Sequence, residues 1–228
     1  MDTEYLGQSM SKSFYFSDSE RKQIAQAVKD AESTTSGEIV PVIVPESDRY
    51  PESYFKSVLF GIVLGFVCFE AYVLLFGGWN TSSGTSLIGL PLFVTLGGGI
   101  VFLGAMFLPT IKRLFISSES MDTAVHNRAT KAFVEHEVFK TRDRTGIVLL
   151  VSLFEKRVEV FGDSGINQAV SADDWSEVIS TIIKGVKSGK TTEAMVDGIR
   201  QCGTLLERLG VEIRPDDTNE LSNLPRFE

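Results

Sequence analysis

Three acidic residues, Glu38, Asp143 and Asp163, have the side chains and the positions needed to bind a metal ion. Glu38 opens one expected strand, Asp143 precedes a second, and Asp163 follows a third. If the first two strands are parallel and the last two form an antiparallel hairpin, all three residues lie at one sheet edge. Because carboxylate oxygens are ligands for Ca²⁺ or Mg²⁺, the sequence predicts a site for one of these ions. Alternatively, they are solvated loop carboxylates, partly neutralised by Arg142 and Arg144.

Three other patterns resemble catalytic or ligand-binding motifs, and we interpret them as structural features. Residues 162–165, GDSG, resemble the nucleophile segment of trypsin-like serine proteases, but the chain has two cysteines and no histidine on a suitable loop. We expect a tight loop there, with glycines for unusual backbone angles. Residues 185–191 are one residue short of a phosphate-binding loop and follow a helix, which favours a helix–helix connection. His126 and His136 are ten residues apart and form no metal-binding motif.

Two apolar runs, residues 58–76 and 87–108, each meet the roughly 20 residues needed to cross about 30 Å of hydrocarbon. Residues 58–111 contain no Lys, Arg or Asp and a single Glu, Glu70. The runs are therefore predicted to be transmembrane helices, with buried core helices as the alternative. A charge inside a span suggests transport or ion coupling, although Glu70 could instead snorkel or bond Thr95.

Basic residues flank the two spans and predict their orientation. Arg49 and Lys56 precede the first span, Lys112 and Arg113 follow the second, and the connector 77–86 carries no charge. Positive residues favour the cytoplasmic side, so both termini are expected in the cytoplasm. The first span also holds Gly61 and Gly65, a GxxxG pair that permits close helix contact within or between molecules.

The rest of the chain has the periodicities of a small α/β domain. Ser17 and Glu20 have capping-box spacing, and a helical apolar pattern follows them. The first expected strand is Glu38–Val44, where Pro41 indicates an edge or a bulge. The remaining expected elements are strands at Gly146–Ser152 and 157–161, a helix with Val125, Ala129 and Ala132 on one face, a helix capped by Ser171 and ended near Gly189, and a last helix with Met195, Ile199, Cys202 and Leu206.

Neither soluble half can bury enough surface alone. We therefore expect one discontinuous domain, residues 14–46 and 118–210, with the hairpin inserted and a disordered acidic tail at 211–228. The fold class is α/β, a small mixed sheet covered by helices with an inserted two-helix transmembrane hairpin. The net charge of −8 argues against nucleic acid as a partner.

The element order resembles the TPM domain family. The segments that carry the resemblance are TSGEIVPVIV at residues 35–44, RTGIVLLVSLFEKRVEVFGDSGI at 144–166, and the two helices after them. The resemblance covers roughly residues 14–209, and it implies a TPM-like sandwich of the membrane-inserted bacterial branch, in the inner membrane. A LemA-type membrane protein is the partner that it implies.

The resemblance also implies divalent metal at acidic loops in some members. Members with a metal-dependent phosphatase assignment have Asp-Asn-Gly before the central strand, whereas this chain has Arg144-Thr145-Gly146. Asp143 lies one residue early, and Asp163 matches the acid of the glycine-rich loop. This departure favours a non-catalytic, membrane-anchored binding or assembly module, acting with a membrane protein or with further copies of itself. A metal-dependent acid phosphatase and a small pore or transport subunit built around Glu70 stay open as alternatives.

Overall fold

The computed structural model describes residues 16–76, 83–211 and 219–227 and separates into two compact units. The first, here called the sheet unit, contains Met1–Ser47 and Asp122–Glu228, and the second, the hairpin unit, contains Asp48–Met121. In sequence, the hairpin unit is therefore an insertion into the sheet unit. The start of the expected domain at 14–15, residues 77–82 of the connector and residues 212–218 of the tail lie outside the described residues.

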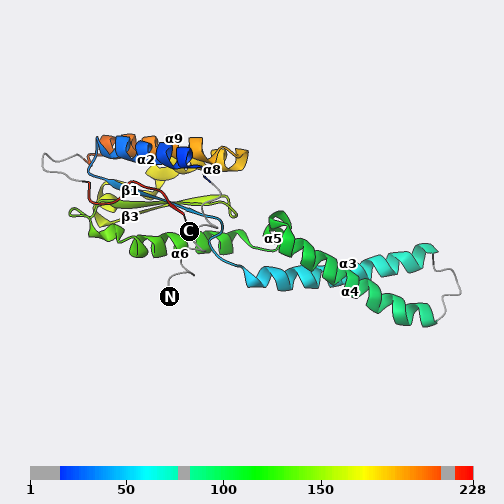
Figure 1. Cartoon of the computed structure of the whole chain (residues 1–228). Coiled ribbons are helices and arrows are strands. Elements are labelled where there is room, and N and C mark those ends of the chain that lie inside the picture. The colour runs from blue at the N-terminus through cyan, green and yellow to red at the C-terminus, as the bar shows by residue number, and fades with distance from the viewer. Residues whose placement is uncertain (1–15, 77–82, 212–218, 228) are drawn as a thin grey trace, which may run out of the picture. The chain divides into compact units, whose positions relative to one another are not determined.

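The sheet unit is built on a mixed four-stranded sheet with the strand order β3-β2-β1-β4 (Figure 1). The central pair, β1 (Glu38–Val44) and β2 (Gly146–Ser152), is parallel, and β2 is antiparallel to β3 (Arg157–Gly162). A two-residue strand, β4 (Arg226–Phe227), lies parallel to β1 at the other edge. The three expected strands occur within one residue of their predicted bounds and with the predicted pairing directions, whereas β4 was not expected. The predicted α/β class with a mixed sheet is confirmed.

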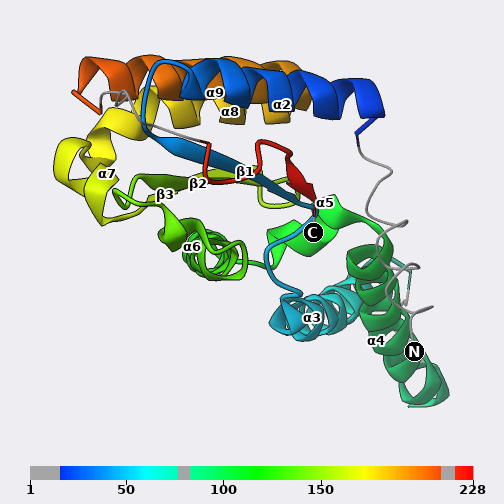
Figure 2. The same cartoon turned by 60° about the vertical axis from the view of Figure 1, so that its left-hand side comes forward.

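Helices cover both faces of this sheet (Figure 2). On one face lie α2 (Asp18–Glu32), α8 (Ser176–Ser188) and α9 (Thr191–Arg208); on the other lies α6 (Ser118–Glu135). Successive residues of a strand point to opposite faces. Ile39 and Ile43 accordingly join the core beneath α2, α8 and α9, while Val40 and Val42 join the core against α6. Burial on both faces explains why β1 and β2 are continuously apolar.

The helix ends follow local rules that the sequence contains. Ser17 forms a capping box with Glu20, as expected. Ser171 also forms a capping box, but over the 3-10 helix η3 (Ala172–Trp175), after which α8 begins. Gly189, with φ of 76°, ends α8 in the left-handed conformation. Two short helices, η2 (Val138–Lys140) and α7 (Ser164–Ala169), were not expected, and α7 replaces the loop predicted at 162–165.

β1 lies next to the edge strand β4, and its pairing explains how the strand accommodates Pro41. The Glu38 N–H donates to Thr145 O, so the alternation along the strand places the Pro41 nitrogen on the side facing away from β2. On that side β4 pairs only with Val42 and Ile43. The expectation of a disordered tail at 211–228 is wrong for residues 219–227, because this segment is ordered along the edge of β1.

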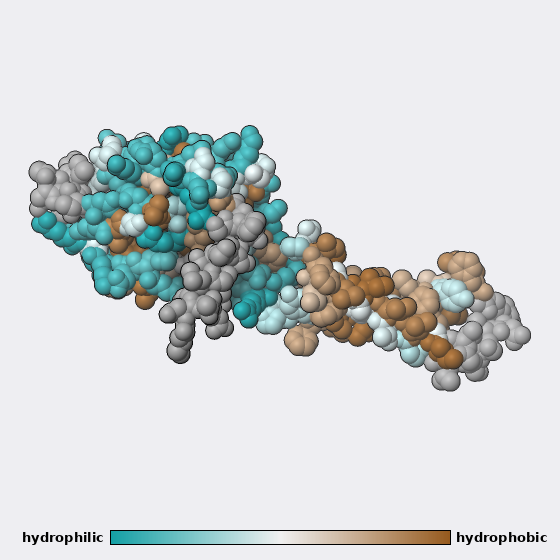
Figure 3. Space-filling model, viewed as in Figure 1, coloured by the Kyte–Doolittle hydropathy of each residue, from teal (hydrophilic) through white to brown (hydrophobic). Residues whose placement is uncertain are grey.

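The hairpin unit contains α3 (Pro51–Phe76), α4 (Ser83–Phe107) and the short α5 (Pro109–Leu114). Helices α3 and α4 are long and apolar enough to cross a membrane. Most of their large apolar side chains face outwards, and Figure 3 shows these apolar residues over both helices. A Cβ at Gly61 would lie 2.3 Å from Gly97 O, and one at Gly65 2.3 Å from Phe93 O. The GxxxG pair therefore lets α3 and α4 pack backbone to backbone.

Candidate functional site

The backbone brings the three predicted acidic positions to one end of the sheet. Glu38 opposes Gly146 in the parallel ladder, and the Asp163 N–H donates to Gly146 O over 2.9 Å. The start of β1, the start of β2 and the end of β3 therefore meet at one end of the sheet, as the sequence predicts. The three carboxylates nevertheless have separate surroundings, which decide what this edge can do.

Asp163 is a buried side chain held by a helix end and by an arginine. It is the N-cap of α7, and its Oδ1 accepts a hydrogen bond of 2.6 Å from the Ser164 N–H. Its Oδ2 lies 3.0 Å from Arg144 Nε, and the side chain is only 5% exposed. Among the described residues, Oδ2 has no well-aligned hydrogen bond. The positive guanidinium is consequently what balances the charge of this oxygen.

A tight loop backbone places Arg144 at this position. Arg144 has a φ of 60°, which is uncommon for a residue with a side chain, and its Nη1 donates to Phe139 O over 3.0 Å. The Gly165 N–H donates to Arg144 O, and a Cβ at Gly165 would lie 2.4 Å from Asp143 O. Gly165 is therefore needed for close approach to this loop. Neither Gly162 nor Gly165 adopts the left-handed conformation that the sequence suggested.

Glu38 faces the C-terminal segment. Its two oxygens accept hydrogen bonds from the Glu220 and Leu221 N–H groups, at 3.0 and 3.2 Å, and the residue is 7% exposed. In return, Glu220 Oε2 accepts from the Arg142 N–H at 2.9 Å. Glu38 therefore attaches residues 219–227, here called the strap, to the start of β1.

Glu32, at the end of α2, is a second carboxylate beside the strap, and no sequence pattern pointed to it. Its Oε1 accepts a 2.8 Å hydrogen bond from the Ile39 N–H, and its Oε2 accepts one from Asn223. Burial, together with the nearby charge of Glu38, raises the pKa of Glu32 to about 8. Glu32 and Glu38 together bind the strap and the start of β1.

Asp143 lies on the exposed outer side of the loop before β2. Among residues 16–76, 83–211 and 219–227, no three His, Cys, Asp or Glu side chains gather closely enough to hold a metal ion. Asp163 faces a guanidinium and Glu38 accepts hydrogen bonds from backbone N–H groups, so both carboxylates already have partners within the chain. In this arrangement the three residues do not fit Ca²⁺ or Mg²⁺, which need several free oxygen ligands.

The two histidines lie apart from this edge. His126 Nδ1 is 3.0 Å from Glu159 Oε1 on the exposed surface. Burial lowers the pKa of His136, and the positive charge of Arg226 adds to this effect.

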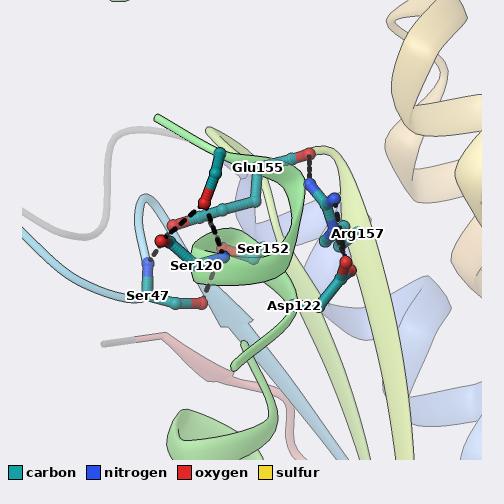
Figure 4. A network of polar contacts seen from close by, with 7 residues as sticks. Ser47, Ser120, Asp122, Ser152, Glu155 and Arg157 are labelled. Atoms are coloured by element: carbon teal, nitrogen blue, oxygen red, sulfur yellow. Dashed lines mark hydrogen bonds and ion pairs between the residues drawn. The ribbon is translucent and has the colours of Figure 1, made fainter. Parts of the chain in front are cut away.

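A buried carboxylate lies at the opposite end of the sheet (Figure 4). Glu155 is fully buried, accepts a 2.9 Å hydrogen bond from the Ser47 N–H, and is hydrogen-bonded to Ser152 Oγ. Nearby, Arg157 forms an ion pair with Asp122. These contacts hold Ser47 and Asp122, the points where the chain leaves and re-enters the sheet unit. We therefore interpret this network as the structural clamp of the insertion.

In the hairpin unit, the residue expected to carry function is Glu70, which is exposed on α3. The sequence suggested a hydrogen bond to Thr95. Instead, the Thr95 hydroxyl donates to Pro91 O over 2.7 Å, one turn earlier on α4. Pro91 lies inside α4. No hydrogen bond or ion pair joins Glu70 to the residues that the structure describes.

Comparison with known proteins matches residues 106–205 to the model of the TPM domain. A solved structure, the NMR structure of BA42 protein from the psychrophilic bacterium Bizionia argentinensis, aligns with a TM-score of 0.55 and 21% identity. The alignment covers 92% of this chain and 94% of that chain, and it shows a shared fold. No curated protein matches the sequence.

Proposed function

We propose that this chain is a membrane-anchored TPM domain that acts as a non-catalytic binding or assembly module in a membrane protein complex. The match of residues 106–205 to the TPM domain model supports the domain assignment. The observation that carries the non-catalytic part is the ion pair between Arg144 Nε and Asp163 Oδ2, at 3.0 Å. A metal-dependent site needs a carboxylate that is free to bind a cation. Here the chain supplies its own cation at that carboxylate.

The anchoring part of the proposal is supported by α3 and α4, two helices long and apolar enough to cross a membrane. Their flanking basic residues, Lys56 and Lys112 among them, favour a multi-pass protein of the bacterial inner membrane with both termini in the cytoplasm. The measurement is labelling of single cysteines with an impermeant maleimide in intact cells, in a Cys68→Ser, Cys202→Ser background. Thr81→Cys should react from outside, and Glu119→Cys only after lysis. The reverse pattern would refute this orientation.

The partner in this proposal is another membrane protein, for which a LemA-type protein is one candidate, or a second copy of the chain. Isolation in native-lipid nanodiscs followed by mass measurement tests this idea. We expect a stoichiometric second chain of either kind. A single chain throughout, at native expression level, would contradict the assembly role.

Enzyme activity is tested on the same purified protein. Phosphate release from a generic phosphomonoester, measured with Mg²⁺ and with Ca²⁺, should stay at the level of an Asp163→Asn variant. Metal-stimulated release that this variant loses would replace the proposal with the phosphatase alternative. Ion flux in liposomes that is lost in Glu70→Gln would likewise favour the pore alternative.

A further inference from the structure

The glycine pair of α3 is already used inside the hairpin. Gly61 and Gly65 are buried against α4, and Gly97 approaches Gly61 O so closely that a Cβ there would lie 2.3 Å away. A GxxxG pair used in this way cannot also bind the helix of another protein. A partner helix must therefore contact a different part of the hairpin surface.

Beside this glycine seam lies an apolar groove of about 490 Å³ between α3 and α4. Its lining residues are Val58, Ile62, Val94, Thr95, Gly98, Gly99 and Phe102. A Cβ added at Gly99 would meet nothing within 4 Å, so the backbone of α4 is accessible there. Helices associate in membranes where small residues let another backbone come close. The groove has this property.

Glu70 lies on the row of α3 side chains that borders the groove. The α3 residues buried in the hairpin recur every four positions, among them Ser57, Gly61 and Phe69. Val58, Ile62 and Glu70 each follow one of these residues, so Glu70 flanks the buried seam on the same side as the groove, about two turns beyond Ile62. Beyond Glu70, the end of α3 carries three large apolar side chains that are 76–84% exposed: Leu74, Leu75 and Phe76. The carboxylate is thus followed by more than a turn of apolar helix.

From this geometry we infer that the groove and Glu70 together bind a transmembrane helix of a partner protein, one that carries a Lys or Arg at the depth of Glu70. This inference rests on the proposed function and specifies the chemistry of its partner. An acidic side chain in hydrocarbon is costly and is normally found paired. None of the described residues pairs with Glu70, and a basic side chain on a helix seated in the groove supplies the missing charge.

The test uses the full chain in proteoliposomes and two synthetic transmembrane peptides as probes. Both are Leu/Ala helices; one carries a single Lys at the depth of Glu70, and the other has Leu there. Energy transfer between labelled chain and peptide gives the affinities. We expect the Lys peptide to bind about five- to thirty-fold more tightly, the effect of 1–2 kcal/mol. Glu70→Gln should erase this preference, and Glu70→Asp should keep it.

The groove is tested separately with Gly99→Leu, which fills it at a position where a side chain meets no neighbouring atom. This change should weaken both peptides, while Leu64→Ala, a matched apolar change outside the groove lining, should weaken neither. Equal affinity of the two peptides, or a preference that survives Glu70→Gln, overturns the inference. Self-association of the chain would also overturn the inference if Gly99→Leu abolishes it and the Lys peptide does not displace it. The groove would then be occupied by a second copy of the chain. If the inference fails while the nanodisc mass still includes a partner, the proposed function stands and the contact lies elsewhere.

Discussion

Glu32 gives the sharpest test of how the strap is held. Burial, with a contribution from the charge of Glu38, raises its pKa to about 8, from an ordinary value of 4.5. Between these two pH values the folded protein keeps a proton that the unfolded chain releases. The stabilisation from protonated Glu32 is therefore complete below pH 4.5 and is lost as the pH rises through 8.

The size of this effect follows from the pKa difference. The change from 4.5 to about 8 corresponds to roughly 5 kcal/mol, at about 1.4 kcal/mol per pH unit. Because Glu32 keeps some contact with water, screening reduces this to roughly 2–4 kcal/mol. Glu32→Gln removes the titration but can keep an oxygen acceptor for the Ile39 N–H. As the pH rises from 5 to 9, the free energy of unfolding of the variant should therefore increase by roughly 2–4 kcal/mol relative to that of wild type.

The assay is urea denaturation of the detergent-solubilised full chain, followed by the fluorescence of the buried Trp175 in a Trp79→Phe background. Glu20→Gln, on the same helix, is the matched control. Hydrogen bonds from Ser17, the backbone one first, lower the pKa of Glu20, so its contribution is present above its ordinary value and is lost only as the pH falls. The difference in free energy of unfolding between Glu20→Gln and wild type should stay constant from pH 5 to 9. A flat difference for Glu32→Gln over the same range would refute the argument that folded Glu32 is protonated.

Three further outcomes follow from the described contacts. Arg144→Leu should destabilise the sheet unit by about 1–2 kcal/mol, since it leaves a buried Asp163 without its countercharge, and Arg144→Leu with Asp163→Asn should recover most of the loss in the same urea assay. Gly61→Leu should separate α3 from α4, because its Cβ would lie 2.3 Å from Gly97 O, and should lower the thermal midpoint of the hairpin unit in detergent. Deleting residues 219–228 should speed amide exchange in β1, which loses β4 and the bonds to Glu38; unchanged exchange would mean that the strap protects nothing.

The sequence is most informative where local rules decide the structure. The apolar run Glu38–Val44 predicts a buried strand with its observed boundaries, and the Ser17–Glu20 capping box marks the start of α2. The edge position suggested by Pro41 is wrong for the strand as a whole, since β1 lies between β2 and β4. It holds locally, because β4 pairs only with Val42 and Ile43, so no ladder partner needs an N–H at Pro41.

The features that the sequence did not reveal depend on contacts between distant residues. The tail from Arg214 onward is polar and acidic and is interrupted by Pro215 and Pro225, which predicted disorder. Glu38, 182 residues before Glu220, nevertheless accepts the backbone N–H of Glu220. Residues 162–165 looked like a loop because Gly, Asp and Ser favour turns. Asp163 instead caps α7, and Ile166, buried in the core, holds that helix in place. The charge of Arg144 was visible in the sequence, but its left-handed backbone conformation was not.

The insertion between β1 and α6 also sets the order in which the protein can be completed. β1 leaves the ribosome long before its partner, since Glu38 pairs with Gly146. At about 5–20 residues per second, synthesis of the roughly hundred intervening residues takes about 5–20 seconds. Throughout that interval an apolar strand has neither neighbour, and Pro41 reduces its ability to pair wrongly with other chains. Pulse-labelled chains of Pro41→Val should therefore aggregate more than wild type, although the mature proteins share one fold.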